Sequence, residues 1–138
     1  MIYRGVQHIG VAVRNLEASL AAWETLFGAR AGPVELNPER GVRLAVLSFE
    51  EGPKVELVTP LDENSTVARF LARRGEGLHH FALEVDDIEA AMAELRRHNV
   101  ELVSEKPQPG MGGSLVVFVH PRSLNGVLLE LRQAPKRD

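Results

Sequence analysis

The 138-residue sequence contains no cysteine, which excludes disulfides, thiolate metal sites and cysteine nucleophiles. It also has no apolar run near the roughly 20 residues that a membrane-spanning helix needs. Sixteen Lys and Arg face nineteen Asp and Glu, and the net charge of −3 gives no overall reason to bind nucleic acid or an anionic membrane. The first residues lead into a strand-like pattern rather than a signal peptide. We therefore expect a small cytoplasmic protein with neither nucleic acid nor membrane as a partner.

The chain contains an internal repeat. Residues 8–19 (His-Ile-Gly-Val-Ala-Val-Arg-Asn-Leu-Glu-Ala-Ser) resemble residues 80–91 (His-Phe-Ala-Leu-Glu-Val-Asp-Asp-Ile-Glu-Ala-Ala), which begin 72 positions later. The apolar positions that follow keep this offset, so a strand period and a helix period repeat together. A unit of this length that occurs only twice suggests a duplicated half-domain rather than a solenoid.

Each half has the pattern of a strand, a helix and further strands. In the first half we expect a strand over 6–13 and a helix over 16–27, which begins after Asn15 as N-cap and ends at Gly28. The buried stripe of this helix is expected to be formed by Leu16, Leu20, Trp23 and Phe27. Two strands over 42–49 and 54–59 complete the half.

The second half repeats this order, after a short helix from the Ser65 cap to Arg74. We expect the following elements: a strand over 79–85, a helix over 88–98, a short strand near 100–104, and strands over 114–119 and 126–132. The predicted fold is α+β, in one domain over 1–138. It consists of two tandem βαβββ modules (about 4–62 and 76–133) that form a curved, cup-like mixed sheet with helices on its outer face.

Four polar residues lie on the strand faces that point away from the helices. His8 and His80 begin equivalent strands, while Glu56 and Glu130 are single carboxylates inside apolar strands, 74 residues apart. An unpaired buried carboxylate costs several kcal/mol, so each should have a partner. One divalent metal would provide a partner for all four side chains. A structural His and a solvent-facing Glu are the plainer alternatives for any one position, but neither explains why both recur in register.

The remaining histidines and arginines are weaker candidates. His79 competes with His80, but strand parity and the repeat favour His80. His120 lines the same cup or caps the turn before Pro121, and His98 is a surface residue at a helix end. A small basic cluster on the short helix is either a solvated face or a contact for substrate phosphates; it comprises Arg69, Arg73 and Arg74.

These residues resemble the vicinal oxygen chelate superfamily, whose paired modules hold a divalent metal, and within it the methylmalonyl-CoA epimerases. The resemblance rests on several segments, among them Val55-Glu-Leu-Val-Thr-Pro-Leu61, Gly75-Glu-Gly-Leu-His-His80 and Gly126-Val-Leu-Leu-Glu130. Position by position, it places the metal ligands on His8, Glu56, His80 and Glu130. It implies Co²⁺, Mn²⁺, Ni²⁺ or Zn²⁺ as the ion, an acyl-CoA substrate and a homodimer.

The resemblance further implies interconversion of (2R)- and (2S)-methylmalonyl-CoA, by proton transfer at C2 through a metal-stabilised enolate. Glu130 would then serve as both ligand and base. Some of these epimerases carry a second glutamate at the position that Leu44 occupies here, so no second base is assigned. Two alternatives stay open. One is a glyoxalase I-like lyase or isomerase acting on a glutathione adduct, and the other is a metal-free small-molecule-binding protein of the same fold.

Overall fold

The computed structural model describes residues 3–136, which fall into two compact units. One unit comprises residues 8–79, and the other combines the N-terminal residues up to Gln7 with the chain from His80 onward. None of the helices within the described residues is both long and apolar enough to cross a membrane.

The unit of residues 8–79 contains the end of the first strand and most of the expected first half. Its elements are β1 (Tyr3–Ala12), α1 (Leu16–Phe27), β2 (Arg30–Ala31), β3 (Glu35–Asn37), β4 (Val42–Ser48), β5 (Lys54–Pro60) and α2 (Thr66–Arg74). The strand order is β2-β4-β5-β1, with β3 also paired to β4. β1 and β5 run parallel, whereas β4 and β5 run antiparallel. The short strands β2 and β3 lie in a segment for which the sequence predicted only a connection.

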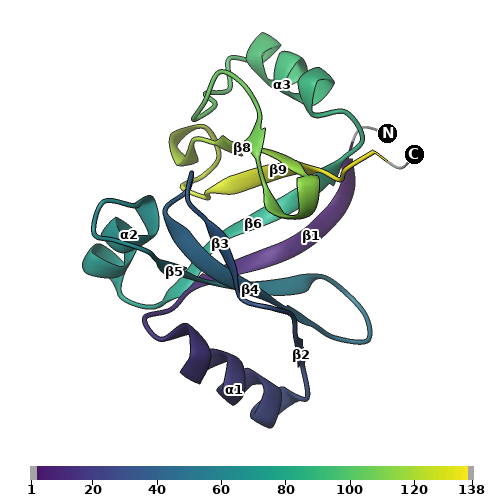
Figure 1. The fold of residues 1–138 in the computed structure, drawn as a ribbon. Helices are drawn as coiled ribbons and strands as arrows, with labels where there is room; N and C mark the ends of the chain where they lie inside the picture. The colour runs from purple at the N-terminus through teal and green to yellow at the C-terminus, as the bar shows by residue number, and fades with distance from the viewer. Residues whose placement is uncertain (1–2, 137–138) are drawn as a thin grey trace. The chain divides into compact units, whose positions relative to one another are not determined.

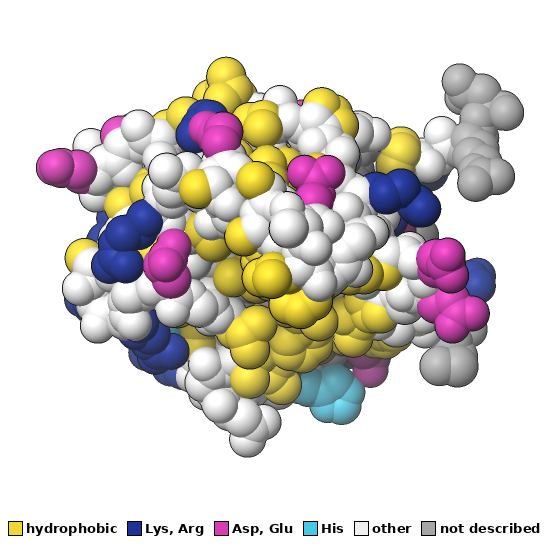
Figure 2. All heavy atoms as spheres, turned by 90° about the horizontal axis from the view of Figure 1, so that it is seen from below, with side chains coloured by type: hydrophobic (Ala, Val, Ile, Leu, Met, Phe, Trp, Pro, Cys, Tyr) yellow, Lys and Arg dark blue, Asp and Glu magenta, His cyan; other side chains and the backbone are white. Residues whose placement is uncertain are grey.

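Helix α1 begins and ends where the sequence predicts. The Asn15 side chain accepts a hydrogen bond from the Ala18 N–H (3.0 Å), and Gly28 ends the helix with a left-handed φ of 68°. Leu16 and Leu20 are buried against apolar residues of β4 and β5. The prediction that Phe27 is buried is wrong, because it is 60% exposed and packs edge-on against Trp23. Figure 2 views the molecule from the α1 side, where apolar side chains are exposed.

The second unit repeats this architecture (Figure 1). Its elements are β6 (Gly77–Val85), α3 (Ile88–Arg97), β7 (Gln108–Pro109), the 3₁₀ helices η1 (Met111–Gly113) and η2 (Pro121–Ser123), β8 (Leu115–Val119) and β9 (Leu129–Gln133). The strand order is β6-β9-β8-β7. β6 and β9 run parallel and β8 and β9 antiparallel, as β1, β5 and β4 do in the first unit. The predicted α+β fold built from two copies of one module is confirmed.

Two strand predictions in this unit need correction. The strand expected near 100–104 is reduced to a single bridge between Leu102 and Val119. The strand expected from residue 126 begins only at Leu129, because Asn125 and Gly126 both take positive φ values (53° and 78°) in a turn. Helix α3 starts as predicted: the Asp87 carboxylate accepts a hydrogen bond from the Ala90 N–H (3.1 Å).

Candidate metal centre

A histidine and a glutamate meet on one face of the first unit. Gly10 of β1 is directly paired with Glu56 of β5, and His8 lies two residues before Gly10, so both side chains point to the same side of the sheet. His8 Nε2 lies 3.5 Å from Glu56 Oε2, with side-chain exposures of only 7% and 5%. The parallel register of β1 and β5 therefore creates a buried His–Glu pair.

The second unit contains the equivalent pair. Ala82 of β6 is paired with Glu130 of β9, and His80 lies two residues before Ala82. His80 Nε2 lies 3.7 Å from Glu130 Oε1, and both side chains are almost fully buried. The His80 ring also meets Phe118 edge-on, at a centroid distance of 5.8 Å. The same strand register thus produces the same pair twice.

The geometry and chemistry of these pairs fit a divalent metal. Both nitrogen–oxygen separations exceed a normal hydrogen-bond length. Ligand atoms about 2.0–2.2 Å from a shared ion lie roughly 3.0–3.5 Å from one another, close to the observed separations. His8, His80 and Glu130 are buried, and each offers one ligand atom. Imidazole nitrogens with carboxylate oxygens are a donor set for divalent transition metals.

An arginine that the sequence analysis did not single out also contacts this region. Arg40 Nη1 lies 3.7 Å from Glu56 Oε1, the oxygen that does not face His8. The Arg40 side chain is 18% exposed, and its backbone N–H donates to Asn37 Oδ1 (3.2 Å). Because Arg40 lies in the connection between β3 and β4, no strand or helix period could have identified it.

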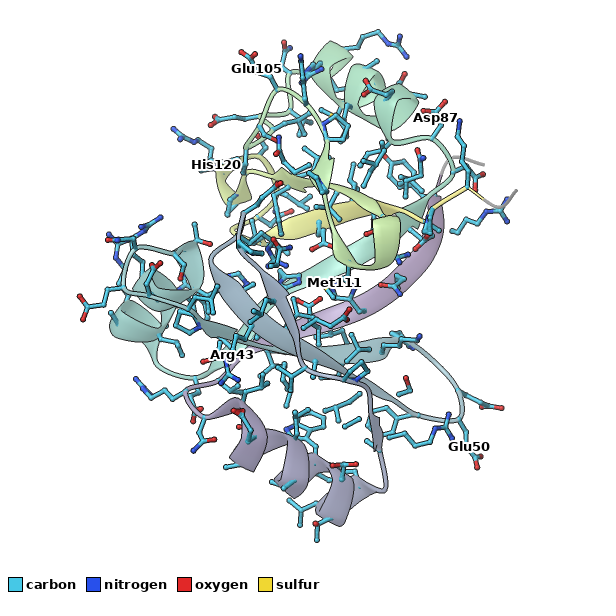
Figure 3. The ribbon with its side chains drawn as sticks, in the orientation of Figure 1. Arg43, Glu50, Asp87, Glu105, Met111 and His120 are labelled. Atoms are coloured by element: carbon cyan, nitrogen blue, oxygen red, sulfur yellow. The ribbon has the colours of Figure 1, made fainter. Side chains whose placement is uncertain are left out.

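The other three histidines contact neighbouring rings, backbone or side chains. His79 meets the Phe70 ring edge-on at 5.0 Å, and its burial, together with the positive charge of Arg40, lowers its pKa to about 4. His120 Nδ1 accepts a hydrogen bond from the Arg122 N–H (3.1 Å), so His120 caps η2 at the place labelled in Figure 3. His98 is largely exposed and pairs with Glu94.

One buried hydroxyl was not identified from the sequence. Ser114 is 2% exposed, and its Oγ has no hydrogen-bond partner among the described residues. By strand alternation along β8, Ser114 shares a face with Phe118, which is paired with Glu130. Counting back in steps of two from Phe118 along the sequence would have placed Ser114 on the same face.

Comparison with known proteins places the chain in a family. Residues 7–118 match the family model described as the glyoxalase/bleomycin resistance protein/dioxygenase superfamily. The chain belongs to this superfamily. The superfamily that the sequence resemblance predicts is therefore confirmed.

Within the superfamily, the chain is similar to methylmalonyl-CoA epimerases. It is 36% identical to the ethylmalonyl-CoA/methylmalonyl-CoA epimerase of Cereibacter sphaeroides, over 93% of this chain and 96% of that protein. The crystal structure of the Mycobacterium tuberculosis methylmalonyl-CoA epimerase matches with a TM-score of 0.94 and 34% identity, over 99% of this chain and 91% of that one. A Streptomyces coelicolor methylmalonyl-CoA epimerase in complex with 2-nitronate-propionyl-CoA matches with a TM-score of 0.93 and 32% identity, over 97% and 99%.

Proposed function

We propose that the protein binds one divalent metal through His8, Glu56, His80 and Glu130 and interconverts the 2R and 2S forms of methylmalonyl-CoA. The observation that carries the proposal is the repeated His–Glu pair, buried in each unit and created by the same parallel register. Two such pairs supply two neutral nitrogen and two anionic oxygen donors, a set suited to Co²⁺, Mn²⁺, Ni²⁺ or Zn²⁺.

The reaction requires removal of a proton from a carbon between a thioester and a carboxylate. When bound, the ion would act as a Lewis acid that stabilises the negative charge developing on these two groups. Glu130 acts as the base that removes the C2 proton from one face, because it is a carboxylate held in a water-poor environment, 2% exposed. Inversion requires that a proton return from the opposite face, and no residue is assigned that role. His8 and His80 contribute neutral donors. Leu44, which is fully buried, supplies no second carboxylate from β4.

The choice of substrate is supported by the similarity to epimerases of acyl-CoA thioesters, one of them solved with an acyl-CoA compound. With that substrate we also propose a homodimer in the cytoplasm. The organisation as one domain, with modules at about 4–62 and 76–133, is part of the same proposal.

Two measurements test this function. Protein purified without chelator is first analysed for bound metal, and then incubated with methylmalonyl-CoA in ²H₂O. We expect about one transition-metal ion per chain and deuterium at C2, both lost after His8→Ala. Metal-loaded protein that produces no exchange would refute the substrate.

Two other results would point to the alternative functions. Isomerisation of a hemithioacetal of glutathione, with no exchange on methylmalonyl-CoA, would indicate a glyoxalase-type enzyme. Protein that binds no transition metal at micromolar concentration would indicate a metal-free binding protein.

A further inference from the structure

The Glu56 carboxylate lies between two different partners. Its Oε2 faces His8 Nε2 at 3.5 Å, whereas its Oε1 faces Arg40 Nη1 at 3.7 Å. All three side chains are largely buried, so water screens the charges of Arg40 and Glu56 poorly. The two oxygens of one carboxylate are thus assigned to different neighbours.

The backbone of the turn that carries Arg40 is held in place by hydrogen bonds. The Arg40 N–H is bonded to the side chain of Asn37, which is itself 8% exposed, and the Gly41 N–H donates to the Pro38 carbonyl (3.2 Å). Gly41 has a φ of 70° and its carbonyl accepts from the Leu61 N–H (2.8 Å). The turn is therefore tied both to itself and to the chain that follows β5.

The charges of the proposed site give this arginine a role. Two ionised glutamates cancel the charge of a divalent ion, and an ion neutralised in this way attracts an anionic substrate weakly. A guanidinium beside Glu56 restores one positive charge, and it can also hold a carboxylate oxygen in a fixed direction.

We propose that Arg40 is a positioning residue for Glu56: it holds Oε1, leaves Oε2 for the ion beside His8, and offsets the carboxylate charge. This inference rests on the metal site of the proposed function. It predicts an energetic coupling between Arg40 and Glu56, since Arg40 has no carboxylate to hold once Glu56 is replaced by glutamine.

The first test uses the metal-free protein. Urea unfolding in the presence of chelator is measured for Arg40→Gln, Glu56→Gln and the double variant. We expect Arg40→Gln to lower the urea midpoint of the original protein but not that of Glu56→Gln. Arg43→Gln is the matched control, because Arg43 pairs with Glu17 of α1 (2.9 Å) and its replacement should act equally in both backgrounds. Equal effects of Arg40→Gln in both backgrounds would overturn the proposal.

The second test uses the metal itself. Co²⁺ affinity and the visible Co²⁺ spectrum, which reports the coordination of the ion, are measured for the same variants. Loss of the guanidinium removes repulsion of the ion in either background, but only with Glu56 does it also release an oriented ligand. We therefore compare the factor by which Arg40→Gln changes the Co²⁺ Kd in the two backgrounds. We expect the increase in Kd to be about 10- to 100-fold larger in the original protein than in the Glu56→Gln background. The spectrum should change only in the presence of Glu56.

The remaining outcomes are also decisive. An unchanged Co²⁺ affinity and spectrum in Arg40→Gln, with a raised KM alone, would mean that Arg40 contacts substrate, and would overturn this inference while leaving the proposed function intact. No Co²⁺ binding by the original protein would overturn both. If Arg40→Gln does not fold, Arg40→Lys takes its place: it keeps the charge without the fork of donors, and a coupling of the same sign is expected.

Discussion

The two glutamates offer an internal comparison that separates binding of the ion from proton transfer. Glu56 and Glu130 occupy equivalent registers, are both buried, and lie at nearly the same distance from their histidines, 3.5 and 3.7 Å. Replacement of either by glutamine keeps the size of the side chain and one oxygen donor. Both variants lose one negative charge at the ion, and Glu56→Gln also leaves the Arg40 charge beside it, so Glu56→Gln should weaken metal binding at least as much as Glu130→Gln.

Only Glu130 is assigned the proton transfer. Loss of a positioned general base lowers the rate by about 10²- to 10⁴-fold. We therefore expect Glu130→Gln to be slower than Glu56→Gln by about that factor, which corresponds to about 2.7–5.4 kcal/mol in the activation free energy.

The assay is deuterium incorporation at C2 of methylmalonyl-CoA, followed by mass spectrometry at saturating Co²⁺, with the metal content of each variant measured. Saturation matters because Glu56→Gln leaves Arg40 beside the ion. If the two variants exchange at equal rates, or if Glu130→Gln exchanges as fast as the original protein, Glu130 is not the base.

Three further predictions concern folding and pH. Met92 is fully buried in the core beneath α3, so Met92→Ala should lower the free energy of unfolding by about 2–5 kcal/mol, measured by urea titration. Asp87→Ala removes the α3 cap and should cost about 1 kcal/mol, whereas the same change at the exposed Glu50 should cost far less. The pKa of His79 is about 4 in the folded protein, below its ordinary value near 6.5, so the unfolded chain takes up the proton first. Stability should therefore fall as the pH drops from about 6.5 to about 4, and His79→Gln should reduce this slope in metal-free protein; an equal slope in both proteins would contradict the assignment.

Much of the fold and the four candidate ligands followed from the repeat. The histidines are 72 residues apart and the glutamates 74, yet the pairing is the same, because each glutamate lies opposite the residue two positions after its histidine and the two extra residues fall in the connecting segments. Strand parity also favours His80 over His79, and in the structure it is His80 that lies beside Glu130.

The errors have physical causes. The helix period predicts which side of α1 carries Phe27, but it does not predict whether other residues cover that side at the end of the helix, where Phe27 is exposed. The apolar run after Gly126 is typical of a strand, but the turn with positive φ values at Asn125 and Gly126 delays the strand, which begins only at Leu129. Arg40 reaches Glu56 from a connection whose path depends on tertiary contacts, which leave no periodic signal.

The way in which register builds each His–Glu pair also makes the centre sensitive to misalignment. A slip of a single position between β1 and β5, or between β6 and β9, would turn the carboxylate to the opposite surface. The proposed ion would then bind and stabilise only molecules with the native strand register in both units, by mass action on the native state. Chains folded in the presence of the metal should therefore contain fewer forms with mispaired strands than chains folded without it.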